Sequence, residues 1–157
     1  MNGFLAQGSE NGFGKKYAHG INDKALTEGD QFIQIVSCNT HNLSCITDTL
    51  AVNHDPDNLK EGIFVCIRRA TDISQASGFI PAPQVAKHGD RIYGSHHAED
   101  AAGLFTTLDM DLNLFSSAMK VPSQYMHVVW FHLRLKEPTT MTQVMDKFEK
   151  NPLVALT

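Results

Sequence analysis

The chain has 157 residues, with 13 Lys and Arg against 17 Asp and Glu, and so a formal net charge of −4. A slightly acidic chain without a basic run lacks the electrostatic footprint of a nucleic-acid binder, and no apolar run approaches the length of a membrane span. The length suits one domain. Because no basic segment followed by an apolar one opens the sequence, we expect no secretory signal and a cytoplasmic protein.

The first part of the chain is predicted as a connector followed by a strand and a helix. Residues 1–30 contain six of the eleven glycines, a density typical of loops. Residues 32–37 are rich in strand-forming side chains. Leu43, Ile46 and Leu50 then repeat at a helical period. Cys38 is therefore expected at a junction between a strand and a helix.

Three more strands and two more helices are predicted beyond this point. The strands are expected at 62–68, 110–121 and 126–136, and the helices at 99–108 and 140–148. The last helix opens with the Thr140-to-Gln143 spacing of a capping box. Residues 71–95 are predicted as a long loop. Because strands and helices do not strictly alternate, the order predicts an α+β fold: a mixed, largely antiparallel sheet with helices on one face.

Cys38 is the first candidate functional residue. At the start of a helix, unpaired backbone N–H groups and the positive end of the helix dipole stabilise a thiolate. A lone cysteine in such a place is also often an inert core thiol, and both interpretations stay open. Cys45 and Cys66 lie on the apolar periods of their own elements and are interpreted as core residues. Three cysteines without a CxxC pair predict reduced thiols, with neither a disulfide framework nor a zinc site.

Two adjacent arginines are the second candidate. Arg68 and Arg69 end an otherwise apolar strand, next to the predicted long loop. Guanidinium groups in such a place suit bidentate binding of an anion. The alternative is a surface ion pair with Asp72.

Histidines supply the remaining candidates. His96 and His97 are adjacent, and two neighbouring side chains do not easily share one metal ion, so we expect contact with an anionic substrate or with solvent. His127 begins an apolar strand. It can serve as an acid or base for Cys38 only if the two side chains face each other; otherwise it is a structural residue.

Four segments of the sequence follow one another as the corresponding segments do in archaeal-type glyceraldehyde-3-phosphate dehydrogenases. The chain resembles the catalytic domain of that family from Gly20 onward. The segments 20–22 (GIN) and 133–148 (LRLKEPTTMTQVMDKF) are also similar to family sequences. The four ordered segments are VSCNT (36–40), IRRATD (67–72), SHHAED (95–100) and KVPSQYMH (120–127).

The resemblance implies roles for individual residues. Cys38 matches the nucleophile, whose thiolate attacks an aldehyde carbon, and His127 matches a histidine that assists proton transfer. Hydride transfer to NAD or NADP would then leave a thioester, which inorganic phosphate attacks. Arg69 matches a position near the cofactor. The positions that match contacts to substrate or phosphate are Ser37, Asn39, Thr40, Arg68, His96, His97 and Ala98.

The chain also departs from the family pattern. Ala98 stands where the family has glycine, and Val129 where it has a second histidine. The family places a Rossmann half before this domain, so residues 1–30 are interpreted as a remnant of its end and residues 31–157 as a catalytic-type domain that is incomplete at its C-terminus. Without the phosphate-binding helix of a Rossmann crevice, we expect this chain alone to bind no dinucleotide and to be inactive as a dehydrogenase.

Other interpretations remain open at this point. The chain is either a fragment or a stand-alone relative, and in the second case a non-catalytic domain that self-associates, with the segment 126–136 as a candidate interface. A related acyl-enzyme dehydrogenase, acting on erythrose 4-phosphate or aspartate semialdehyde, and a hydrolytic Cys–His enzyme are further alternatives. The expected partners are a phosphorylated aldehyde, inorganic phosphate and copies of the same chain, with neither nucleic acid nor membrane.

Overall fold

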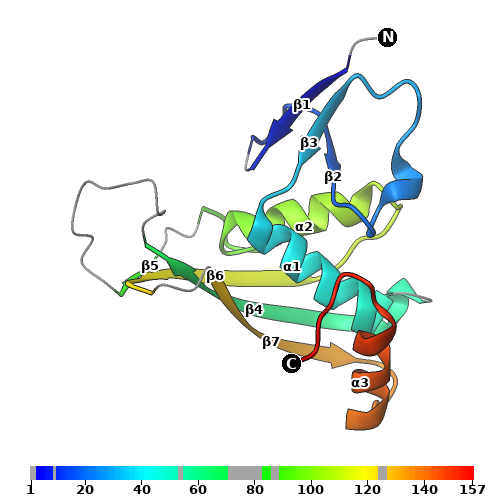
Figure 1. Cartoon of the computed structure of the whole chain (residues 1–157), viewed down its shortest axis with the longest axis vertical. Coiled ribbons are helices and arrows are strands. Elements are labelled where there is room, and N and C mark those ends of the chain that lie inside the picture. The colour runs from blue at the N-terminus through cyan, green and yellow to red at the C-terminus, as the bar shows by residue number, and fades with distance from the viewer. Residues whose placement is uncertain (1–2, 9, 53–54, 71–82, 86–88, 124–126) are drawn as a thin grey trace.

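The computed structural model describes residues 3–8, 10–52, 55–70, 83–85, 89–123 and 127–157 (Figure 1). Within these residues the chain forms a main sheet of four strands, a small sheet of three strands and three α-helices. The helices are α1 (Cys38–Thr47), α2 (His96–Thr106) and α3 (Met141–Lys150). Helices α1 and α2 lie between the two sheets, and α3 lies at one end of the main sheet (Figure 1).

The main sheet has a mixed topology. Its strands are hydrogen-bonded in the order β5 (Gln84–Val85), β6 (Leu114–Val121), β4 (Leu59–Arg69) and β7 (His127–Leu135). Strand β4 pairs in parallel with β6, while the β4–β7 and β5–β6 pairs are antiparallel. Helices α1 and α2 contact each other and pack on the same face of this sheet. The predicted α+β fold, with a largely antiparallel main sheet and helices on one face, is therefore confirmed.

Alternation of side chains along β4 determines which face the helices cover. Phe64 and Cys66 are fully buried, whereas Ile63 and Val65 are partly exposed. Because successive strand residues point to opposite faces, Phe64 and Cys66 point toward the helices. Each fully buried apolar side chain contributes roughly 1.5–3 kcal/mol. The largest fully buried apolar side chains are Phe64, Phe105, Leu43, Leu104 and Leu114.

The small sheet corrects the prediction of a connector over residues 1–30. Strands β1 (Phe4–Gln7) and β2 (Lys15–Tyr17) lie in that range, and both pair in parallel with β3 (Phe32–Ile35). Strands this short carry little signal of their own, because pairing with β3 and packing decide their conformation. Whether this range is a remnant of a Rossmann half stays a prediction.

Side chains tie the small sheet to α2. The Lys16 ammonium of β2 lies 2.7 Å from the Asp100 carboxylate of α2, and the exposed fractions of these side chains are 14% and 4%. The amide nitrogen of Asn22 donates to the carbonyl of Lys16 at 2.9 Å and to the Thr107 hydroxyl at 2.8 Å. Asn22 is completely buried. These bonds join the N-terminal region to α2.

Several element boundaries differ from the predicted ones. Helix α1 continues into a π-helical turn over Asp48–Val52, and α2 begins at His96, three residues before the predicted start. Strand β6 begins at residue 114 and not at 110. Within the predicted loop 71–95, residues 71–82 and 86–88 lie outside the described residues, and Gln84–Val85 form β5. The predicted capping box of α3 is confirmed, with Thr140 and Gln143 bonded reciprocally.

Candidate functional site

Cys38 is the first residue of α1, and its side chain is exposed. The helix begins here because Ser37 is its N-cap: the backbone N–H of Thr40 donates to the Ser37 hydroxyl at 3.4 Å, and the two hydroxyl oxygens are 2.9 Å apart. The predicted strand-to-helix junction is therefore confirmed. The free N–H groups of the first turn and the positive end of the dipole lie beside this sulfur.

The ends of β4 and β7 bring two further candidates together. Arg68 of β4 and His127 of β7 are direct partners in the antiparallel register, so their side chains lie on the same face of the sheet. This is the face of Phe64 and Cys66, which α1 and α2 cover. Arg69 is the next residue of β4 and therefore points to the opposite face. The side chains of Arg68 and Arg69 therefore do not line the same pocket.

Electrostatic effects on Cys66 place both Cys38 and Arg68 near this residue. Burial raises the pKa of the Cys66 thiol to about 11, and both Arg68 and Cys38 lie close enough to act on that pKa. The exposed thiol and the guanidinium thus each lie near the sulfur of Cys66. Because Cys66 is fully buried, Cys38 is the accessible member of the pair.

His97 completes the cluster from the start of α2. Its exposed fraction is 1%, and burial lowers its pKa to about 3, with further lowering by His96, Arg68 and His127. The ring centroids of His96 and His97 are 3.9 Å apart, and loss of water around its ring also lowers the pKa of His96. His97 is therefore a neutral imidazole at pH 7. Four candidates predicted from distant parts of the sequence thus lie near one another: Arg68, His96, His97 and His127.

The remaining predicted contact residues are less accessible. Thr40 and Ala98 are completely buried, and Ala98 belongs to the hydrophobic core. Asn39 is 1% exposed, and neither its amide oxygen nor its amide nitrogen has a hydrogen-bond partner among the described residues. A buried amide without partners is costly, and this one lies beside Cys38. Substrate contact by these residues stays a prediction.

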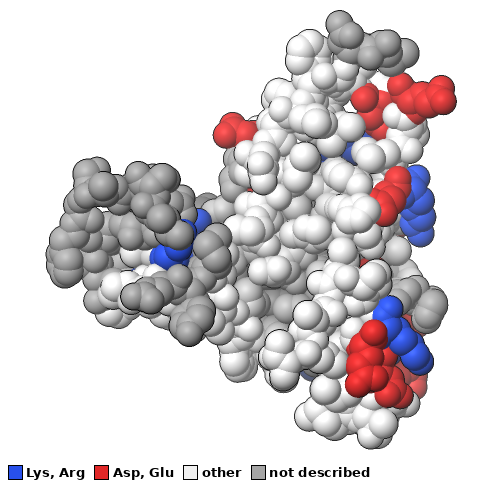
Figure 2. Space-filling view, viewed as in Figure 1, with Lys and Arg blue, Asp and Glu red and all other residues white. Residues whose placement is uncertain are grey.

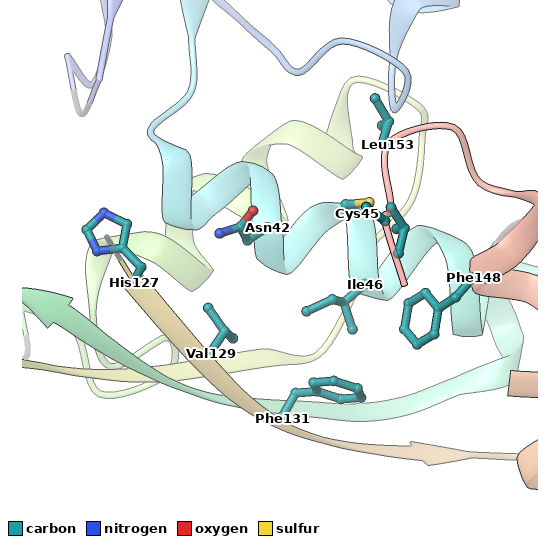
Figure 3. A pocket seen from close by; sticks show the side chains of 10 residues that line it. Asn42, Cys45, Ile46, His127, Val129, Phe131, Phe148 and Leu153 are labelled. Atoms are coloured by element: carbon teal, nitrogen blue, oxygen red, sulfur yellow. The ribbon is translucent and has the colours of Figure 1, made fainter. Parts of the chain in front are cut away.

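A cavity of about 360 Å³ opens beside the cluster, between α1, β7 and the C-terminal segment (Figure 3). His127 and Asn42 are its polar side chains, and most of its wall is apolar: Cys45, Ile46, Val129, Phe131, Phe148, Leu153, Val154 and Ala155. Asn42 was missed by the sequence analysis. It lies one helical turn after Cys38 and therefore on the same side of α1, a spacing that could have identified it.

The surface around this cavity carries few charges. In Figure 2 the centre of the molecule is largely free of Lys, Arg, Asp and Glu, and charged side chains gather over α3 and near the small sheet. In the part of the chain that the structure describes, no group of three or more His, Cys, Asp and Glu side chains is arranged to hold a metal ion. None of the described helices has the length and apolar character that a membrane crossing requires.

Acid should destabilise the protein through His97. Its pKa is lower in the folded chain than in the unfolded one, so its full contribution is present above about pH 6.5 and is lost as the pH falls toward 3. We expect the free energy of unfolding to fall by about 2 kcal/mol from this residue between pH 7 and pH 5. Urea unfolding at pH 7 and pH 5 measures this fall in the free energy of unfolding. His97→Gln should remove this loss, whereas His132→Gln, on an exposed site of β7, should retain it; equal losses in both variants would contradict the assignment.

The fold and the cluster define a class of protein: an α+β domain with an exposed cysteine at a helix start and a separate group of arginine and histidine side chains. Glyceraldehyde-3-phosphate dehydrogenases from archaea are similar to this chain. The one from Methanothermus fervidus is 30% identical over 133 residues, which cover 82% of this chain and 35% of the relative. Those from Pyrococcus furiosus and Methanococcus vannielii are 30% and 32% identical over 82% and 80% of this chain.

The predicted resemblance is therefore confirmed: the chain is a sequence relative of the archaeal-type glyceraldehyde-3-phosphate dehydrogenases. It spans about a third of the length of the curated relatives it matches. No protein-family model matches the chain.

Proposed function

We propose that this chain carries the aldehyde-reactive thiol of glyceraldehyde-3-phosphate dehydrogenase chemistry, with Cys38 as the nucleophile. The observation that carries the proposal is an exposed cysteine at the start of α1 that lies near Cys66, as does Arg68. A helix N-terminus and a neighbouring guanidinium both favour the thiolate. The apolar cavity beside His127 offers room for the carbon chain of a small substrate.

The first chemical step needs only residues of this cluster. The thiolate of Cys38 attacks the carbonyl carbon of glyceraldehyde 3-phosphate, so a C–S bond forms while the π electrons of the C=O bond move to its oxygen. That oxygen then takes a proton from His127, which gives a neutral hemithioacetal. Arg68 holds the phosphate group of the substrate by charge-assisted hydrogen bonds. Ser37, Thr40 and Asn39 shape the wall beside the thiol.

Oxidation of the hemithioacetal requires a hydride acceptor, which is NAD or NADP for the family. The described residues fit a dinucleotide poorly. A pyrophosphate site needs a glycine-rich turn between a strand and a helix, but β1 leads through a turn to β2, and β3 leads to α1 through Val36 and Ser37. Arg69, which matches a cofactor position, points away from Cys38. We therefore derive no step through the cofactor from this chain.

Protection from alkylation tests the thiol role. Glyceraldehyde 3-phosphate should slow the labelling of Cys38 by iodoacetamide several-fold, because the hemithioacetal has no free thiolate; peptide mass spectrometry measures the rate. Glycerol 3-phosphate has no carbonyl group and should protect much less. Arg68→Ala should weaken the protection, whereas Arg134→Ala, an arginine of β7 that is 59% exposed, should not. Equal labelling with and without the aldehyde would overturn the proposal.

Self-association is the second candidate, and one feature favours it. Trp130 and Val128 of β7 are 54% and 57% exposed on the face of the main sheet opposite α1 and α2. Among the described elements no helix covers this face (Figure 1). A large exposed apolar sheet face is typical of an interface, and a second copy of the chain could supply the same face. Sedimentation at tens of micromolar should detect a dimer that Trp130→Lys dissociates; a clean monomer would exclude it.

A further inference from the structure

A chain of two buried hydroxyls ends at His97. The Ser95 hydroxyl oxygen lies 3.0 Å from Nδ1 of His97 and 2.6 Å from the hydroxyl oxygen of Ser116. The backbone N–H of Ala98 donates to the Ser116 hydroxyl at 3.0 Å. Exposed fractions are 1% for Ser95, 1% for His97 and 0% for Ser116. Because these side chains are closed to solvent, the two hydroxyl protons can be donated only to groups within this hydrogen-bonded series.

The distances indicate the direction of the protons. The Ser116 hydroxyl receives the N–H of Ala98, and its own proton can go to the Ser95 hydroxyl at 2.6 Å or to the Ser95 carbonyl at 3.4 Å. If it goes to the hydroxyl, the Ser95 proton goes to His97 and every short contact is a hydrogen bond. In the reverse direction, His97 donates to Ser95 and Ser95 donates to Ser116. The Ser116 proton can then go only to the Ser95 carbonyl at 3.4 Å, which is at the limit of a hydrogen bond. The short contact between the two hydroxyls therefore favours an Nδ1 of His97 that accepts.

The other ring nitrogen of His97 then carries the proton. A neutral imidazole has one N–H, and the burial of this ring together with the neighbouring Arg68 and His127 keeps it neutral. This N–H belongs to a ring that lies near His96, Arg68 and His127.

We propose that Ser116, acting through Ser95, fixes His97 in the Nε2–H form, so that His97 donates a hydrogen bond to the carbonyl oxygen of a bound aldehyde. Ser116 is thus a positioning residue. His97 stabilises the negative charge that develops on this oxygen when Cys38 attacks, while His127 transfers the proton. The identity of the acceptor rests on the proposed function; the arrangement of protons does not.

Nitrogen-15 NMR of the histidine rings tests the proton arrangement directly. In the native chain at pH 7, His97 should have a protonated Nε2 and an unprotonated Nδ1; His97→Gln assigns its signals among the eight histidines. Ser116→Ala should produce a detectable Nδ1–H population. Ser44→Ala is the matched control, because Ser44 is also fully buried and its hydroxyl has no partner among the described residues. A protonated Nδ1 in the native chain, or an unchanged spectrum in Ser116→Ala, would overturn the inference.

The donor role has a second readout that a purely structural serine would not affect. Ser116→Ala should raise the concentration of glyceraldehyde 3-phosphate that gives half-protection of Cys38 by up to about tenfold, the worth of one hydrogen bond, and Ser44→Ala should not. If the aldehyde protects Cys38 but His97 carries its proton on Nδ1, only this inference fails. If the Nε2–H form is found but the aldehyde gives no protection, the proposed function fails and the proton arrangement stands.

Discussion

Iodoacetamide should alkylate Cys38 at least about a hundred times faster than Cys66 at pH 8. With a pKa of about 11, only about 0.1% of the Cys66 thiol is ionised at that pH, and its side chain has no exposed area. Burial also raises the pKa of Cys45, which is 9% exposed and whose sulfur accepts a weak hydrogen bond from Asn151. Cys38 is exposed at a helix start, so the reagent can reach its sulfur.

A time course of peptide mass spectrometry gives the three rates from one sample. Cys38→Ser should leave only the two slow reactions, which controls for any label on other side chains. Alkylation in urea should make the three rates similar, since the differences arise from the fold. If Cys38 in the native chain reacts no faster than Cys45, its sulfur is not the available nucleophile, and the enzyme-derived account loses its main support.

Asp100→Ala should lower the free energy of unfolding by about 3–5 kcal/mol. The loss arises because the Lys16 ammonium, with only 14% of its side chain exposed, is left without its carboxylate partner 2.7 Å away. Removing one member of a buried ion pair costs more than removing both, so the double variant Lys16→Met, Asp100→Leu should recover most of the loss. The same pair joins β2 to α2, and its loss affects both sheets.

Urea unfolding, followed by circular dichroism, measures these differences. Asp146→Ala on α3 is the matched control, because this aspartate is exposed and its removal should change stability by less than about 0.5 kcal/mol. A loss below about 1 kcal/mol for Asp100→Ala would mean that water solvates Lys16 in the folded chain.

The sequence predicted best where the pattern was local. The capping box of Thr140 and Gln143 and the helical spacing of Leu43, Ile46 and Leu50 depend on neighbours within a few residues, and α3 and α1 form where expected. The strands of the small sheet were missed because β1 and β2 have only four and three residues and exist through their pairing with β3.

The candidate site shows the same limit. Arg68 and Arg69 could have been assigned to opposite faces from strand alternation alone, but the pairing of Arg68 with His127 depends on the register of two strands far apart in the chain. Family resemblance supplied these partners where periodicity could not. The hydroxyl chain from Ser116 to His97 left no pattern in the sequence, since it joins residues that are close only after β6 and α2 pack together.

The proposed nucleophile and its proposed partners, Arg68 and His127, are held by different sheets. Strand β3 of the small sheet ends at Ile35, three positions before Cys38, and the N–H of the next residue, Val36, donates to the Tyr17 carbonyl of β2 at 3.0 Å. Arg68 and His127 are fixed by the main sheet. The distance between the Cys38 sulfur and the His127 imidazole therefore depends on how the small sheet and the main sheet are aligned. A change that destabilises the small sheet should therefore shift Cys38 relative to Arg68 and His127, even when the change is far from the thiol.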